Sequence, residues 1–190
     1  MRARIVHIAA VSCVALLAAL LPAASGAQTM WSVNRHTYQV VDDAVDYMEA
    51  AAAAEAAGGY LATMTSAAEN AWLTSTFGVD ALNIHWFGGY QLEGSSEPDG
   101  GWRWVTGEPW SYTNWRDGEP NDSDGEEVLS FEPNTSSDGA TWNDSDADNT
   151  LRGYVIEWDG PSVPVLDPRG LAALAVLLAA VAVLALRTRG

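Results

Sequence analysis

The stretch from Asn114 to Asp144 carries the side chains best suited to chemistry, because it is rich in carboxylates and Asn amides. It contains Glu119-Pro120-Asn121, then Glu126, then Trp142-Asn143-Asp144. Between Asp117 and Asn149 there are eleven acidic residues and no Lys, Arg or His, so these carboxylates repel one another unless a cation neutralises them. Their oxygens are the hard donors that calcium prefers, whereas zinc and copper favour His and Cys. The alternative is a solvated acidic loop, and composition alone weights the two interpretations equally.

Two further readings of this stretch concern its acids and its tryptophans. Glu119 and Glu126 invite a glycosidase hypothesis, with one acid and one base. No carboxylate pair stands in a visibly apolar setting, and metal ligation would keep both ionised, so we expect no enzyme. Trp110 and Trp115 flank the loop and would either stack on a sugar ring or pin the loop to the core, which is the more frequent role.

The first 27 residues have the pattern of a secretory signal peptide. Arg2 and Arg4 precede an apolar run, and Ser25-Gly26-Ala27 supplies the small residues that a signal peptidase reads. The alternative is an uncleaved membrane anchor. Cys13 is the chain's one cysteine and lies inside the apolar run. Cleavage would therefore leave a mature protein with no disulfide, which its core or a bound metal must stabilise.

The other end of the chain has the pattern of a membrane-directed segment. After a linker and short motif at 161–169, residues 170–190 comprise an apolar run and a basic tail with Arg187 and Arg189. As a helix, the 17 residues from Gly170 to Leu186 span about 26 Å, slightly short of a hydrocarbon core of ~30 Å. Motif, helix and Arg pair resemble the bacterial sorting signals of the PEP-CTERM and IPTL-CTERM kind, which exosortase-like transpeptidases handle. A plain transmembrane anchor is the alternative, and either places the middle of the chain at the cell surface or in an extracellular matrix.

Residues 28–160 should form one domain. They hold 24 of the 25 acids and only four arginines, which gives a formal charge of −20, so nucleic acid is excluded as a partner. All nine tryptophans also fall here, and such an aromatic content indicates a packed domain rather than a disordered acidic segment.

The pattern of this domain predicts two helices followed by short strands. Asp42-Asp43 would cap a helix that buries Val45, Met48 and Ala52 and extends to Ala57. Ser66 and Glu69 form a capping-box pattern for a second helix, which Gly78 ends and which buries Ala68, Ala71, Trp72 and Leu73. Strands are expected at 31–41, 60–62, 86–90, 102–105, 127–131, 140–142 and 153–158. Helices that precede a run of strands indicate an α+β domain with short antiparallel sheets.

Residues 31–158 contain an ordered series of short motifs: Gly58-Gly59-Tyr60-Leu61-Ala62-Thr63, Ser66 to Leu73, Trp86-Phe87-Gly88-Gly89, Trp104, Thr113-Asn114-Trp115, Glu119-Pro120-Asn121, Gly125-Glu126 and Trp142-Asn143-Asp144. Through these motifs, nearly the whole of this stretch resembles the C-type lectin-like domain.

The resemblance implies a calcium-dependent sugar site on the long loop. Its ligands here would be Glu119, Asn121, Glu126, Asn143 and Asp144, with Asp144 also offering its backbone carbonyl, and with a cis peptide before Pro120. Calcium takes about six to eight oxygens, so five side chains and one carbonyl leave up to two positions open for neighbouring sugar hydroxyls. In the family, the Glu-Pro-Asn order goes with mannose-type glycans (mannose, glucose, fucose or N-acetylglucosamine), and Gln-Pro-Asp with galactose.

The chain also departs from the family pattern. Val128 stands where the family has a cysteine, and Gln91 falls near a ligand of an auxiliary calcium. The competing hypothesis is a lectin-like module that binds protein, or serves as an adhesin or matrix element, without binding sugar.

Overall fold

The computed structural model describes residues 26–132 and 140–160 of the 190-residue chain. Most of the expected signal peptide and the whole of the expected sorting segment, 161–190, therefore lie outside the described residues. Within the described part, no helix is long and apolar enough to cross a membrane.

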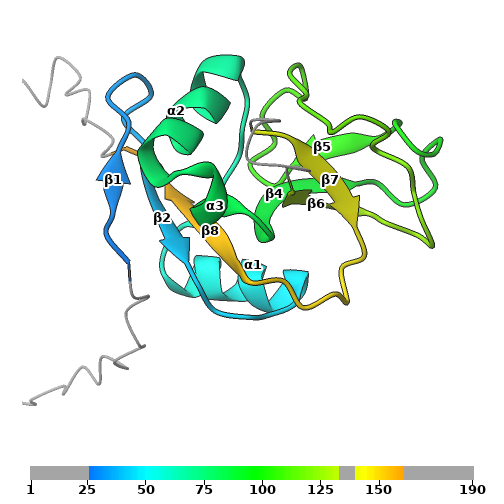
Figure 1. The fold of residues 1–190 in the computed structure, drawn as a ribbon, viewed down its shortest axis with the longest axis horizontal. Coiled ribbons are helices and arrows are strands. Elements are labelled where there is room, and N and C mark those ends of the chain that lie inside the picture. Colours follow the sequence, from blue (N-terminus) through cyan, green and yellow to red (C-terminus); the bar gives the residue numbers. More distant parts are fainter. Residues whose placement is uncertain (1–25, 133–139, 161–190) are drawn as a thin grey trace, which may run out of the picture.

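The described domain is an α+β fold built on one mixed sheet (Figure 1). Its hydrogen-bonded order is β1-β2-β8-β4-β6-β7, with β3 added to β8 and β5 added to β4. Strands β4 and β8 run parallel, and the other pairs are antiparallel, as predicted. The strands are β1 Thr29–Met30, β2 Thr37–Val41, β3 Tyr60–Leu61, β4 His85–Gln91, β5 Trp102–Trp104, β6 Val128–Phe131, β7 Trp142–Ser145 and β8 Gly153–Trp158.

Helix α1, Tyr47–Ala56, begins later than the sequence predicts. Its N-cap is Asp46, which exchanges a capping box with Glu49, so the cap predicted at Asp42-Asp43 is wrong. The buried face is also different, because Tyr47, Ala50 and Ala54 point inward while Met48 and Ala52 are exposed. Tyr47 packs edge-on against Trp86 with ring centroids 5.6 Å apart, and this contact fixes the rotation of a helix in which six of the ten residues are alanine.

Helix α2, Ala67–Phe77, has the predicted Ser66 cap and ends at Gly78. A short helix α3, Val79–Leu82, follows it, which the sequence did not indicate. The capping box is only half formed, because the Glu69 carboxylate bonds Thr65 instead of returning to the backbone of Ser66. Leu73 is buried and Trp72 partly so, but Ala68 and Ala71 are exposed. The buried face instead contains Glu69 and Asn70, whose side chains enter polar contacts inside the domain.

Two hydrophobic clusters hold the sheet from its two sides. One lies under α1 and includes Trp86 and Ile156. The other includes Leu73 of α2 and extends to a group of tryptophans, among them Trp104 and Trp142. Figure 1 shows α1 and α2 on different sides of β2 and β8, and the long connection from β5 to β6 projecting at the far end of the domain. Residues 105–127 of that connection contain no helix or ladder strand, so their position depends on contacts with β7 and the tryptophans.

Candidate functional site

The five candidate ligands come from two segments that the fold brings together. Glu119, Asn121 and Glu126 lie on the β5–β6 connection, and Asn143 and Asp144 lie on β7. The connection is attached to β7 by backbone bonds on both sides of a bridge between Trp115 and Trp142. The Trp142 amide donates to the Asn114 carbonyl at 3.0 Å, and the Arg116 amide donates to the Trp142 carbonyl at 2.8 Å.

Asp144 anchors the turn that carries the first two candidates. One of its carboxylate oxygens, Oδ2, accepts the backbone N–H of Asn121 at 2.9 Å and that of Asp122 at 2.7 Å. The peptide between Glu119 and Pro120 is cis, as expected. The other oxygen, Oδ1, is buried and has no hydrogen-bond partner among the described residues. Burial therefore leaves one carboxylate oxygen beside the loop with its lone pairs unused.

Arg116 is the residue of this site that sequence reasoning missed. It stands just before the cation-free acidic stretch, and its guanidinium reaches into that stretch. Its Nη2 donates to Oε1 of Glu119 at 2.7 Å and to Oδ1 of Asn143 at 3.0 Å. Its Nη1 donates to the carbonyl of Glu132 at 3.2 Å and lies 3.8 Å from that residue's carboxylate. The spacing of three between Arg116 and Glu119 was the available signal, but the contact with Asn143 depends on the fold.

Two of the remaining contacts also link one candidate to another. The Asn121 side-chain amide donates to Oε2 of Glu119, and the Asn143 amide donates to the carbonyl of Asp144. Oε2 of Glu126 accepts the Ser123 backbone N–H at 3.2 Å. Each amide nitrogen therefore points at an oxygen that a metal would otherwise use.

The electrostatics of the site are those of crowded carboxylates. Burial first, and then the neighbouring Asp144 charge, raise the pKa of Glu126 to about 7. Burial likewise raises the pKa of Asp144, although the backbone N–H groups that it accepts act in the opposite direction. Burial also raises the pKa of Glu132, against the effect of Arg116. In all three carboxylates, the neighbouring hydrogen-bond donors and positive charges do not offset the cost of burying the negative charge.

The donor set fits calcium in kind. Three carboxylates and two amides offer only oxygen, and Asp144 contributes a buried oxygen without a partner. In the part of the chain that the structure describes, however, no group of three or more His, Cys, Asp or Glu side chains is arranged to hold a metal ion. In this arrangement Arg116 donates to Oε1 of Glu119 and Oδ1 of Asn143, and the Asn121 amide donates to Oε2 of Glu119.

The tryptophans beside the loop pin it to the core. Trp115 lies 4.8 Å from Trp102 and 5.7 Å from Trp142 between ring centroids, and Trp110 lies 4.4 Å from Trp104. Trp110 and Trp115 are partly buried in this cluster. The packing role, which we judged the more frequent one, is the role that the structure shows.

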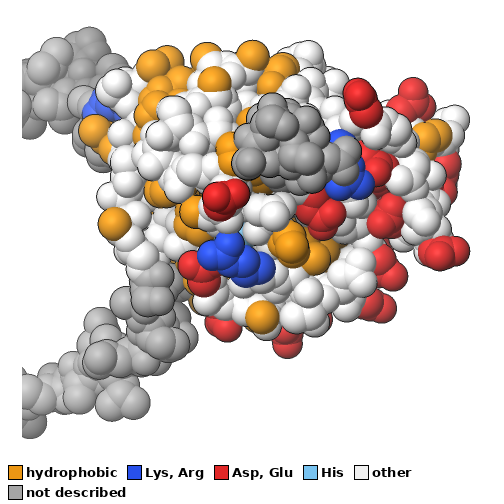
Figure 2. Space-filling model, in the orientation of Figure 1, with side chains coloured by type: hydrophobic (Ala, Val, Ile, Leu, Met, Phe, Trp, Pro, Cys, Tyr) orange, Lys and Arg blue, Asp and Glu red, His pale blue; other side chains and the backbone are white. Residues whose placement is uncertain are grey.

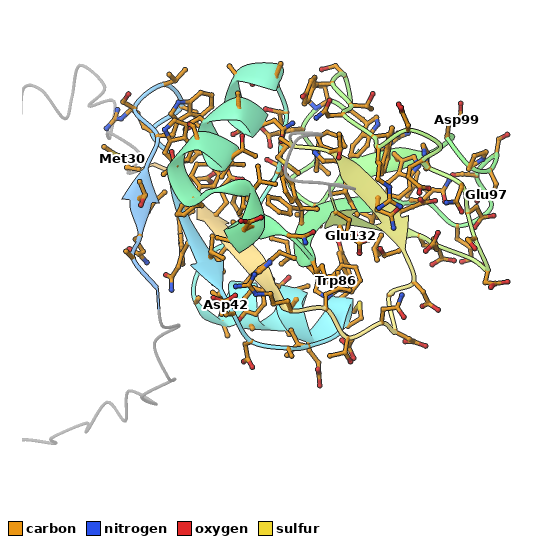
Figure 3. The ribbon with its side chains drawn as sticks, in the orientation of Figure 1. Met30, Asp42, Trp86, Glu97, Asp99 and Glu132 are labelled. Atoms are coloured by element: carbon orange, nitrogen blue, oxygen red, sulfur yellow. The ribbon has the colours of Figure 1, made fainter. Side chains whose placement is uncertain are left out.

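Acidic residues at the tips of the long loops lie outside this hydrogen-bonded group, whereas Glu132 contacts Arg116. Figure 2 shows acidic side chains concentrated at the end of the molecule that the long loops form. Figure 3 places Glu97 and Asp99 at the outer tip of these loops, away from Glu132. Gln91, near the position of a possible auxiliary calcium, donates to the carbonyls of Pro98 and Gly100 and so closes its own loop.

Comparison with known proteins decides the family. The model of the family described as Lectin C-type domain matches residues 43–155, more than half of the chain. The chain belongs to the C-type lectin domain family. A perlucin-like protein of Mytilus galloprovincialis is 31% identical over 116 residues, which cover 60% of this chain and 70% of the relative. Halomucin of Haloquadratum walsbyi is 31% identical over 146 residues, which cover 66% of this chain but 1% of that protein.

Solved structures of C-type lectin domains share the fold. The cow CD23 carbohydrate-recognition domain, solved in the presence of an oligosaccharide, is 26% identical with a TM-score of 0.54; the match covers 66% of this chain and 88% of that domain. A calcium-independent type II antifreeze protein has a TM-score of 0.58 at 19% identity, over 74% of this chain and 95% of that one, and shows the fold alone. The predicted α+β C-type lectin-like fold is confirmed. The C-type lectin domain family is not a family of enzymes.

Proposed function

We propose that this C-type lectin domain binds glycans in a calcium-dependent manner, with a mannose-type preference. The observation that carries the proposal is the buried, unpartnered Oδ1 of Asp144 beside four other oxygen-bearing side chains of the two facing segments. Membership of the family supports carbohydrate binding in general. The calcium site and the sugar preference rest on the residues themselves.

The proposed roles follow from the side chains. Glu119, Asn121, Glu126, Asn143 and Asp144 would hold the ion, and the bound ion would supply coordination sites for two adjacent sugar hydroxyls. Asp144 keeps the loop in place through the backbone amides that it already accepts. Asn121 and Asn143 each carry an amide that can donate to a sugar oxygen once it leaves its present acceptor.

The test is a glycan array probed with and without calcium. We expect binding to mannose-type glycans that EDTA abolishes, and loss of binding in the N121A/N143A variant while its metal-free fold persists. Calcium at millimolar concentration should also raise the melting temperature by mass action. Binding that survives both EDTA and the double substitution would disprove calcium-dependent recognition.

The sugar preference has a separate test. The E119Q/N121D variant introduces the Gln-Pro-Asp order that the family associates with galactose. We expect its binding to move from mannose-type to galactose-type glycans, with calcium affinity measured in parallel to separate lost metal from altered choice. If calcium still binds and the preference for mannose-type glycans is unchanged, the proposed role of the Glu-Pro-Asn order is wrong.

The second candidate function is a lectin-like module that binds protein, or acts as an adhesin or matrix element, without sugar. The hydrogen bonds of Arg116 favour it, because they satisfy Glu119 and Asn143 without any metal. A melting temperature that calcium leaves unchanged, together with an array free of signal, would support this alternative.

We further propose that the domain is exported and held outside the cytoplasm. Residues 1–27 would be removed as a signal peptide, and residues 161–190 would act as a sorting or anchor segment. Mass spectrometry of the mature protein tests this, with an N-terminus at Gln28 as the expected result. Clustering on a surface would raise the avidity of a single weak sugar site.

A further inference from the structure

Arg116 contacts two of the five candidate ligands through a single nitrogen. Its Nη2 lies 2.7 Å from Oε1 of Glu119 and 3.0 Å from Oδ1 of Asn143. The Glu119 side chain is only 7% exposed and that of Arg116 21%, so the interaction is partly shielded from water. Charge-assisted bonds in such a setting are stronger than those of exposed pairs. The guanidinium therefore acts as the counter-ion of these oxygens.

The same oxygens are the ones that a metal ion needs. Asn143 has one side-chain oxygen, so any metal bound by this residue must use the atom that now accepts from Arg116. Both oxygens of Glu119 already accept a hydrogen bond as well, Oε1 from Arg116 and Oε2 from Asn121. A guanidinium and a divalent cation repel each other strongly at such short separations in a partly buried site. Calcium and the present position of Arg116 are therefore mutually exclusive.

The Arg116 side chain has a second carboxylate within reach, while hydrogen bonds hold its backbone in place. The backbone N–H donates to the Trp142 carbonyl, and the backbone carbonyl accepts the Glu119 N–H at 2.9 Å. The carboxylate of Glu132 lies 3.8 Å from Nη1, beyond hydrogen-bond distance. A rotation of the side chain toward Glu132 would free both ligand oxygens and keep the guanidinium paired, without any change in the path of the loop.

We propose that Arg116 is a built-in competitor of calcium, which occupies the oxygens of Glu119 and Asn143 in the metal-free domain and sets the calcium concentration at which the site fills. This inference rests on the calcium site proposed above. Arg116 also supports the metal-free loop, because without it two partly buried oxygens of that site lose their donor. One residue thus keeps the loop ordered at low calcium and weakens calcium binding.

The test compares Arg116→Gln with Arg152→Gln. Both substitutions remove one positive charge, and Arg152 is also ion-paired, with Nη2 2.9 Å from Asp42 on a different part of the domain. Calcium affinity is measured by calorimetry, and terbium(III), which takes the same oxygen ligands, is followed by its tryptophan-sensitised luminescence. We expect R116Q to bind calcium roughly tenfold more tightly than the unaltered domain, while R152Q changes affinity far less. In EDTA, R116Q should melt at a lower temperature.

Each outcome separates the two proposals. If the unaltered domain binds calcium and R116Q binds it equally or more weakly, Arg116 supports the ligands and the competition is wrong, while the proposed function stands. If the unaltered domain binds neither ion but R116Q binds either, Arg116 blocks the site completely; the competition is then supported and the calcium-dependent function is overturned. If neither protein binds either ion, both proposals are overturned.

Discussion

The hydroxyl of Tyr38 lies 3.0 Å from Oε1 of Glu157, and neither side chain is exposed to solvent. The same hydroxyl lies 2.6 Å from Oε1 of the buried Glu69. A hydroxyl carries one proton and can donate to only one of these carboxylates at a time. The second contact is satisfied when a proton lies on Glu157, although Nδ1 of His36, 2.5 Å from the same Oε1, and the Thr63 backbone N–H, 2.8 Å from Oε2, favour the charged form. Burial, which raises the pKa of Glu157 to about 6, is consistent with that arrangement.

Stability should therefore depend on the protonation of Glu157. Because its folded pKa lies above its ordinary value of 4.5, the folded state binds the proton more tightly than the unfolded chain. This contribution is fully present below pH 4.5 and is lost as the pH rises through 6, where the unfolding free energy should have fallen by about 1–2 kcal/mol. Urea unfolding of the unaltered domain and of E157Q between pH 4 and 8 measures the effect.

The difference between the two curves isolates Glu157, because other groups titrate in the same range, Glu126 with the same sign and His85 with the opposite sign. Burial lowers the pKa of His85, so that residue's contribution is present above its ordinary value of 6.5 and is lost as the pH falls. E157Q retains this second dependence. An unchanged difference between the proteins across the range would show that Glu157 does not carry a proton in the fold.

The parts of the fold that depend only on residues close together in the chain can be predicted from the sequence. Strand β8, Gly153–Trp158, is where the sequence predicts it, because glycine precedes a run of strand-forming residues. The start of α1 does not follow, since Asp42, Asp43 and Asp46 are all good caps. The choice depends on Val45, which pairs with Leu151 outside any named strand and so keeps the chain extended up to Asp46.

The candidate site likewise has a part that the sequence predicts and a part that it does not. The resemblance to the C-type lectin-like domain predicts the five candidate side chains and the cis peptide before Pro120, and the structure contains that cis peptide. It does not predict that Arg116 binds Asn143, because these residues are 27 positions apart and meet only when the loop lies along β7. For the same reason, an acidic stretch without internal cations receives its counter-charge from a residue just outside it.

Asp144→Asn should remove calcium binding without harming the metal-free domain. Asn keeps an oxygen for the backbone amides of Asn121 and Asp122, and it removes a buried negative charge. We expect a melting temperature in EDTA equal to or above that of the unaltered domain, and no further rise with calcium. The control is D144A, which leaves two N–H groups without an acceptor and should cost about 1–3 kcal/mol. A calcium-induced shift retained by D144N would contradict the assigned role.

Gly153→Ala should strongly destabilise the fold, because the start of β8 has no room for a side chain. A Cβ there would lie 2.0 Å from the carbonyl oxygen of Val41 and 2.8 Å from Nε2 of His85, on strands that pair with β8 or lie beside it. We expect a loss of about 3 kcal/mol or more in urea unfolding. Thr150→Ala, at a nearby exposed position, should change stability by less than about 0.5 kcal/mol. Similar values for the two variants would show that the backbone relaxes around the added methyl group.

Trp115→Ala should loosen the long loop and leave the sheet intact. The Trp115 ring packs on Trp102 and Trp142, whereas few backbone bonds hold residues 114–127 to the rest of the domain. Local opening therefore requires much less free energy than global unfolding once this contact is removed. Hydrogen exchange followed by mass spectrometry should become faster in peptides covering 114–127 and remain slow in β8.

The matched control for the loop is Trp72→Ala. Trp72 is also partly buried and stacks on another tryptophan, Trp31, with ring centroids 5.8 Å apart, but it lies on α2. Its loss should speed exchange in 67–77 and leave 114–127 unchanged. Equal acceleration of both regions by either variant would mean that the tryptophans stabilise the domain as a whole and do not pin the loop locally. Faster exchange confined to 114–127 in W115A would establish the link between the aromatic core and the arrangement of the candidate site.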